Sequence, residues 1–173
     1  ALDRVPAYGA QTLHEALQSL RILHFCMWCE GDYHNTLGRF DQYMRPYYEA
    51  DIDAGRLDET GALERIEEFF LACNRDSDLY PGVQQGDNGQ SLVLGGMTPD
   101  GQDGYNLLSE MCLKASAELR LIDPKINLRV SAQTPLEAFE LGTQLTKLGL
   151  GFPQYENDDV AIPALEKLGY ATP

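Results

Sequence analysis

The polar loop that ends at Gln90 carries side chains well suited to hold a small ligand. Residues 86–96 read GDNGQSLVLGG, so Asp87, Asn88 and Gln90 come directly before a short apolar run. Loop residues bind ligands when a rigid scaffold positions them, and carboxylates and amides can orient a polar substrate by hydrogen bonding. The loop occupies residues 74–90, and loops of such length are commonly functional.

A second polar group comes before a glycine–arginine pair. Tyr33, His34 and Asn35 precede Gly38 and Arg39 in a predicted strand or loop. Histidine is the side chain best suited to proton transfer near neutral pH. A single histidine is equally a common structural residue, so the sequence leaves both roles open for His34.

Two other patterns resemble metal sites without meeting their requirements. Cys26 and Cys29 form a C-x-x-C pair, but a structural zinc needs four ligands and no second pair stands at the required spacing. Both lie in an apolar helix, so we predict buried structural thiols. The acids after residue 74 resemble an EF-hand loop, but Leu79 and Gln85 stand where that loop requires Gly and Glu. We therefore expect no metal site.

Arg39 and Asp41 could clamp a substrate, but a structural role is the better interpretation. An arginine that is partly buried is held by partners, so we predict that both side chains fix nearby backbone. Elsewhere the sequence contains no dinucleotide fingerprint, P-loop or nucleophile elbow.

The composition is that of an acidic globular protein. Among 173 residues, 43% are hydrophobic and the net charge is −14. Such a surface repels phosphate groups, so we expect neither a nucleic-acid partner nor an anionic membrane. No apolar run reaches the length of a membrane span, and no secretory signal is apparent, so a cytoplasmic location with reduced cysteines is expected.

Helical and strand patterns alternate along the chain. We expect helices over residues 12–31, 58–73, 105–121 and 134–148, the first of them buried on most sides. Short apolar strands are expected near residues 33–38, 91–95 and 126–131, then a loop, with Pro163 opening a final helix. This alternation predicts an α/β fold with parallel strands and outer helices.

Three long stretches, taken together, resemble the glycyl radical enzymes of the pyruvate formate-lyase group. They are GRFDQYMRPYYEADIDAGRLDETGALERIEEFF, LVLGGMTPDGQDGYNLLSEMCLKA and DPKINLRVSAQTPLEAFELGTQLTKLGLGFPQYENDD. The similarity covers about residues 20–169. It implies that residues 1–173 are one internal segment, half of a ten-stranded β/α barrel, that lacks the thiyl cysteine loop and the glycyl radical domain.

The resemblance also implies a substrate pocket. In the family, the loop before the Gly-Gly turn and the segment before the Gly-Arg pair line that pocket. The polar side chains here suggest a substrate more polar than pyruvate. The substrate-binding residues predicted in this way are Tyr33, His34, Asn35, Gln85, Asp87, Asn88 and Gln90.

We therefore expect the parent protein to be a glycyl radical lyase or dehydratase that takes a hydrogen atom from a small polar substrate with a thiyl radical. The segment alone would bind no cofactor and have no turnover, while the parent would carry a protein glycyl radical installed by a separate activating enzyme. We also expect a homo-oligomer. The alternative is a non-catalytic α/β ligand-binding or interaction module.

Overall fold

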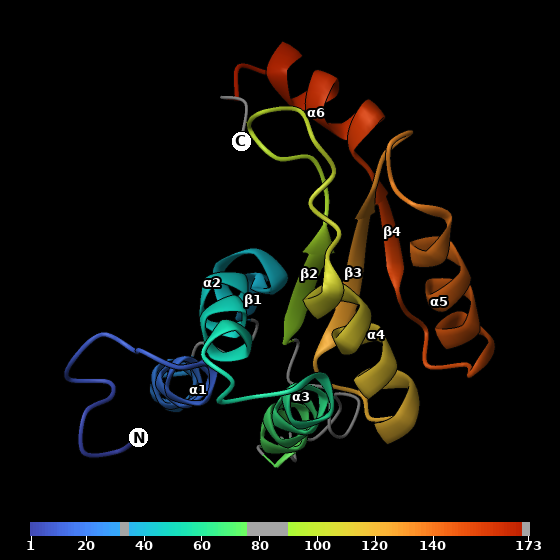
Figure 1. Cartoon of the computed structure of the whole chain (residues 1–173). Coiled ribbons are helices and arrows are strands. Elements are labelled where there is room, and N and C mark those ends of the chain that lie inside the picture. The colour runs from blue at the N-terminus through green and yellow to red at the C-terminus, as the bar shows by residue number, and fades with distance from the viewer. Residues whose placement is uncertain (32–34, 76–89, 171–173) are drawn as a thin grey trace.

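The computed structural model describes residues 1–31, 35–75 and 90–170. Within these ranges helices and short strands alternate, as Figure 1 shows. The elements are α1 (Leu13–Cys29), β1 (Thr36–Arg39), α2 (Phe40–Asp53), α3 (Glu59–Asn74), β2 (Ser91–Gly95), α4 (Leu107–Leu119), β3 (Lys125–Val130), α5 (Leu136–Lys147), β4 (Gln154–Asn157) and α6 (Asp158–Lys167).

The four strands form one parallel sheet in the order β1-β2-β3-β4. The register pairs Ser91 with Lys125 and Asn127 with Gln154. The three predicted parallel strands are thereby confirmed. The fourth strand was missed, because all four residues of β4 are exposed and QYEN has no apolar alternation to mark a strand.

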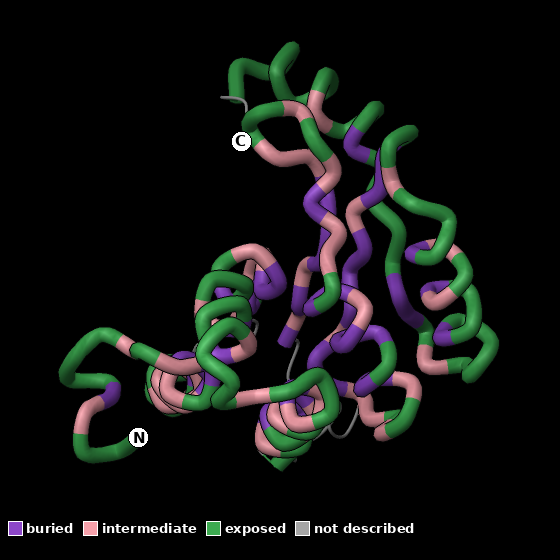
Figure 2. The backbone as a smooth tube through the Cα atoms, in the orientation of Figure 1, coloured by how far each residue is buried: buried purple, intermediate pink, exposed green. Residues whose placement is uncertain are grey.

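Alternate residues of the central strands point to opposite faces of the sheet. One face packs against the helices and forms the buried core, which Figure 2 shows in purple. The strand residues of this buried face are Leu92, Leu94, Ile126, Leu128 and Val130. Among the residues between them, which face the other way, Asn127 is buried, whereas Ser91, Val93, Lys125 and Arg129 stay partly exposed.

Helix starts follow the capping residues in the sequence. The Asp58 carboxylate accepts from Gly61 N at 2.8 Å at the start of α3. Asn106 and Ser109 form a reciprocal capping box at the start of α4. These side chains satisfy backbone N–H groups that have no partner inside the helix. A cap also sets α6, which begins after Asn157 instead of at Pro163.

Helix α1 is more exposed than its sequence predicts. Leu23, Phe25 and Met27 are 53%, 43% and 47% exposed, and the thiols of Cys26 and Cys29 are exposed as well. The prediction of buried thiols was therefore wrong. An apolar surface that runs around the whole helix indicates burial only where a second element covers it, and here α2 and α3 cover one side.

None of the helices in the described ranges has both the length and the apolar character that a membrane crossing requires.

A pair of glutamates links two of the packed helices. Glu67 on α3 shares a hydrogen bond with Glu118 on α4, and burial together with this acidic partner raises the pKa of Glu67. The folded state then holds the proton more tightly than the unfolded state, so stability falls as the pH rises from about 4.5 through the folded pKa. We expect Glu67→Gln to raise the melting temperature at pH 7 and to have little effect at pH 4.

Thermal unfolding at the two pH values checks this expectation. Glu140→Gln, at an exposed position on α5, serves as the control and should leave the melting temperature unchanged at both. A Glu67→Gln effect of the same size at pH 4 and pH 7 would contradict it.

Candidate functional site

Two of the seven predicted substrate-binding residues lie in the described part of the chain, and they come together. The register pairs Thr36 with Ser91, and the Thr36 hydroxyl donates to the Ser91 carbonyl at 3.1 Å. Asn35 and Gln90, directly before these residues, therefore share the amino-terminal edge of the sheet. The other five lie outside the described residues: Tyr33, His34, Gln85, Asp87 and Asn88.

Gln90 is fully buried and lies on the helix-covered face of the sheet. Its Nε2 donates to the Cys73 carbonyl near the end of α3 at 3.2 Å, and its own carbonyl accepts from Lys125 N at 2.8 Å. In this structure the side chain ties β2 to α3. The substrate contact predicted for Gln90 stays a prediction.

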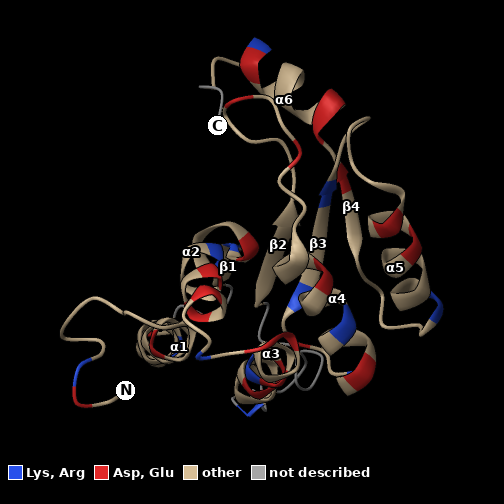
Figure 3. Cartoon of the chain, viewed as in Figure 1, with Lys and Arg blue, Asp and Glu red and all other residues tan. Residues whose placement is uncertain are grey.

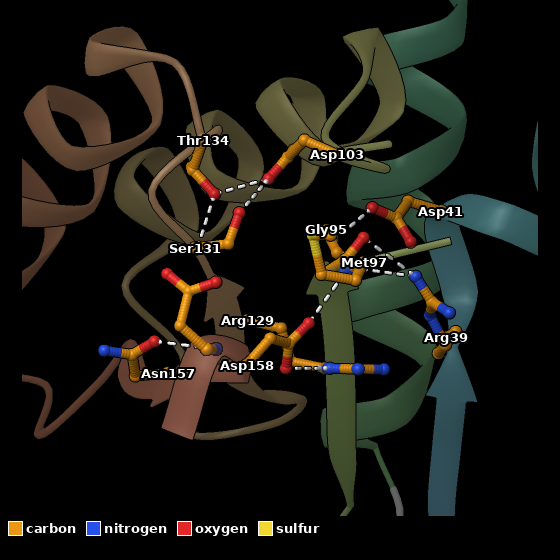
Figure 4. A network of polar contacts seen from close by, with 12 residues as sticks. Arg39, Asp41, Gly95, Met97, Asp103, Arg129, Ser131, Thr134, Asn157 and Asp158 are labelled. Carbon is orange, nitrogen blue, oxygen red and sulfur yellow. Dashed lines mark hydrogen bonds and ion pairs between the residues drawn. The ribbon is translucent and has the colours of Figure 1, made fainter. Parts of the chain in front are cut away.

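The opposite, carboxyl-terminal edge carries an extended set of polar contacts, which Figure 4 shows from close by. Asp41, in the first turn of α2, accepts from Gly95 N at 2.7 Å and from the Ser109 hydroxyl at 2.5 Å. Arg39 Nη2 donates to the Gly95 and Gly96 carbonyls at 2.9 and 3.1 Å. The structural role predicted for Arg39 and Asp41 is thereby confirmed.

The Gly-Gly turn that Arg39 and Asp41 bind has no room for a side chain at either glycine. Gly95 and Gly96 have φ values of +65° and +84°, a left-handed region that disfavours residues with a Cβ. A Cβ on Gly96 would lie 2.7 Å from Arg129 Nε, and one on Gly95 would lie 3.0 Å from the Arg129 carbonyl. Both glycines are therefore required for close approach to β3.

Arg129 extends the network to the last strand and helix. Its Nε donates to Asp158 Oδ1 at 2.8 Å, while Asp158 Oδ2 accepts from Met97 N at 2.6 Å. The next acid, Asp159, accepts from Ala132 N at 2.7 Å. The segments that follow β2, β3 and β4 are thus linked to one another by side chain-to-backbone bonds (Figure 4).

One more acid joins the segment after β2 to the start of α5. Asp103 accepts from the Thr134 hydroxyl and, at 3.5 Å, from the Ser131 hydroxyl. Together with the previous contacts, this defines what we call the carboxyl-edge network. Its side chains are Arg39, Asp41, Asp103, Arg129, Ser131, Thr134, Asp158 and Asp159.

The charges in this network perturb one another. Burial, and then repulsion from Arg129, lower the pKa of Arg39, which Asp41 partly offsets. Burial raises the pKa of the Asp41 carboxyl, although its bonds from Gly95 and Ser109 act in the opposite direction.

The network as it stands is a positioning device. Its named donors and acceptors already bind backbone groups or one another, which fixes the segments that follow the strands. Open α/β sheets commonly bind ligands outside the carboxyl ends of the strands, but in this chain the network's own bonds occupy that edge. A hollow of about 320 Å³ lies beside the network, lined by residues that include Met97, Asp158, Asp159 and Ile162. Across the described ranges, no group of three or more His, Cys, Asp or Glu side chains could hold a metal ion.

The sequence analysis did not single out Arg129, Asp158 or Asp103. A signal was present for Arg129, which lies between Leu128 and Val130 in the predicted strand INLRV, where a partly buried charge requires a partner. Asp158 carries a weaker signal, because an acid at the first position of a helix is common whether or not it binds elsewhere. Neither pattern identifies the partner.

Comparison with known proteins identifies the family. A family model described as Pyruvate formate lyase-like matches residues 1–172. Trans-4-hydroxy-L-proline dehydratase of Clostridioides difficile is 30% identical over 96% of this chain and 22% of its own length. Isethionate sulfite-lyase of Bilophila wadsworthia is 31% identical over 93% of this chain and 20% of its own length.

A solved structure supports the same conclusion. This chain superposes with a TM-score of 0.91 on a solved structure that concerns 1,2-propanediol dehydration in Roseburia inulinivorans. The two sequences are 33% identical, and the match covers 98% of this chain and 21% of that one. The predicted fold class, part of a glycyl radical enzyme barrel, is confirmed. The chain spans about a fifth of the length of the relatives it matches. It belongs to the pyruvate formate lyase-like family of glycyl radical enzymes.

Proposed function

We propose that these residues form part of a glycyl radical dehydratase or lyase that acts on a small polar substrate. The observation that carries the proposal is the match, over nearly the whole chain, to relatives named as a dehydratase and a sulfite-lyase. In the reaction, a cysteine thiyl takes a hydrogen atom from a substrate C–H bond, which leaves a thiol and a substrate radical. The substrate radical then loses water or another leaving group, and the thiol returns a hydrogen atom to the product radical.

The four cysteines of this chain do not suit the thiyl role. Cys73 and Cys112 are fully buried in the core, where a substrate cannot reach them. Cys26 and Cys29 lie near the end of α1. We therefore propose that the glycyl radical, which supplies the oxidising equivalent once an activating enzyme has installed it, and its partner cysteine come from elsewhere in the enzyme.

This chain's own contribution is to bind and orient the substrate. Asp87 and Asn88 would hydrogen-bond its polar groups, and His34 would orient a hydroxyl or move a proton to it. Asn35 and Gln90, which share the amino-terminal edge, support a pocket on that side, since the segments 32–34 and 76–89 attach there. At the opposite edge, the carboxyl-edge network keeps the strands in register.

Substitution in the complete, radical-loaded enzyme tests this assignment. We expect His34→Ala to lower kcat by about 100-fold or more, the range for a lost acid–base group. Asn88→Ala should lower kcat/KM by about 10- to 100-fold, as for one hydrogen bond to a polar group. Gln144→Ala, exposed on α5, is the control.

Electron paramagnetic resonance of each variant measures the amount of glycyl radical, and it should match that of the wild type. Full activity in both variants would reject the site residues while leaving the family reaction intact. A wild-type enzyme that carries the radical but turns over no candidate hydroxylated or sulfonated substrate would instead favour a non-catalytic binding module.

A further inference from the structure

A groove between α1 and α3 is separate from both edges of the sheet. These two helices pack against each other below the sheet, where Figure 1 shows them nearly end-on. The groove encloses about 680 Å³. Its apolar floor includes Leu17, Ile22, Phe25 and Phe69. Phe25 is 43% exposed, so part of this floor meets solvent.

The rim of the groove is basic, whereas the chain as a whole is strongly acidic. Among the lining residues are Arg21, Arg65 and Arg75, against a single acid, Glu68. The whole sequence has 13 basic and 27 acidic residues, and Figure 3 shows acidic positions, in red, spread over the helices, including α3. A local excess of positive charge on such a protein attracts an anionic partner by long-range forces.

Two of the three arginines, Arg21 and Arg65, have contacts within the groove. Arg21 Nη2 donates to the Ala72 carbonyl at 3.1 Å, and its guanidinium lies 5.5 Å from the centre of the Phe25 ring. Arg65 pairs with Glu68 at 2.6 Å on the exposed surface, where an ion pair is worth little and can be exchanged for a partner's carboxylate. Arg75 is exposed at the end of α3.

The length of the groove indicates the size of its occupant. The lining runs along α1 from His14 to Cys26 and along α3 from Arg65 to Arg75. At a rise of 1.5 Å per residue these walls are about 18 and 15 Å long, which equals three turns of helix. A trough of this length between two helices, with an apolar floor and charged rims, is the geometry that receives an amphipathic helix.

We infer that the groove between α1 and α3 is a docking site for an acidic amphipathic helix of another protein. The apolar face of that helix would cover Phe25 and Ile22, and its carboxylates would meet Arg65 and Arg75. This inference does not depend on the proposed function, because no residue of the groove belongs to either edge of the sheet.

A designed peptide tests the inference directly. The probe is a fluorescein-labelled 14-residue helix with leucines along one face and glutamates on both sides of it; the control peptide has lysine for every glutamate. We expect the acidic peptide to bind the wild-type protein at least about tenfold more tightly than the lysine peptide, with affinity that falls as salt is added.

Charge reversal in the groove is the matched protein variant. Arg65→Glu with Arg75→Glu should weaken binding of the acidic peptide at least about tenfold, because charge reversal replaces attraction by repulsion between like charges. Arg45→Glu, at an exposed arginine on α2 outside the groove, should leave the affinity unchanged. Equal affinity of the two variants for the peptide, or no binding to the wild type, would overturn the inference.

A second measurement uses the wild-type protein and needs no variant that could misfold. Cys26 lines the groove, whereas Cys29 lies one turn further along α1 and does not. Bound peptide should slow iodoacetamide labelling of Cys26 relative to Cys29, as read by peptide mass mapping. Unchanged Cys26 labelling at saturating peptide would also overturn the inference. If the protein self-associates as its concentration rises and the peptide abolishes this self-association, the occupant of the groove is a second copy of this chain and not another protein.

Discussion

Gly96→Ala is expected to lower the free energy of unfolding by about 2–4 kcal/mol. The new methyl group would meet the Arg129 side chain at 2.7–2.9 Å, inside normal contact distance. It would also sit at a φ of +84°, where a residue with a Cβ costs about 1–2 kcal/mol. Overpacking adds about 1–3 kcal/mol. For a domain of this size the melting temperature should fall by about 5–15 °C, as measured by calorimetry or circular dichroism.

Gly149→Ala separates the two causes. Gly149 has a similar φ of +78°, but a Cβ there would have no neighbour within 4 Å. The control should therefore show only the backbone cost of about 1–2 kcal/mol. If both variants lost the same stability, the contact between the Gly-Gly turn and Arg129 would have no energetic weight, and the description of a crowded turn would be wrong.

Asp41→Ala is expected to lower the free energy of unfolding by about 3 kcal/mol at pH 7. The substitution removes the acceptor of Gly95 N and of the Ser109 hydroxyl, and it leaves a buried donor without a partner. An unsatisfied buried group costs about 1–3 kcal/mol, and bonds to a charged partner are worth about 1.5–3 kcal/mol. Asp53→Ala, exposed on the same helix, should change stability by less than about 0.5 kcal/mol.

Asp41→Asn tests the charge separately from the hydrogen bond, because the amide oxygen can still accept from Gly95 N. Burial raises the pKa of Asp41, so the folded protein holds that proton more tightly than the unfolded chain. The stability of the wild type therefore falls, relative to Asp41→Asn, as the pH rises from about 3.8 through the folded pKa. Urea unfolding of both proteins at pH 4 and pH 7 measures the difference. A constant difference between them would contradict a perturbed Asp41.

The sequence predicted the elements whose signals are local. The apolar runs at β2 and β3 and the cap at Asp58 each depend on residues that are close along the chain, and all three are confirmed. Strand β4 and the start of α6 were missed because their signals are not local in the sequence. The four exposed residues of QYEN form a strand because β3 lies beside them with free hydrogen-bonding groups, and that neighbour is set by tertiary structure.

The site was predicted less completely than the fold. Asn35 and Gln90 were both assigned to the substrate pocket, which stays a prediction, and parallel pairing of β1 with β2 places them at one edge of the sheet. The carboxyl-edge network was not foreseen as a whole. The bonds that join its different segments span 27–68 positions of sequence, as between Ala132 and Asp159 or Asp41 and Ser109. Spacing along a sequence cannot identify such pairs, because each depends on which strands become neighbours.

The consecutive strand order β1-β2-β3-β4 has a consequence for how the chain acquires its structure. Every strand pairs with the strand made just before it, so each new pairing needs only a chain segment that has already left the ribosome. Pairing between consecutive strands keeps the contact order lower than pairing between strands further apart in the chain would, which favours faster folding within the limits of a parallel sheet. Each strand–helix unit can therefore dock on its predecessor during translation, and a further unit can join at β4 without disrupting any pair already formed.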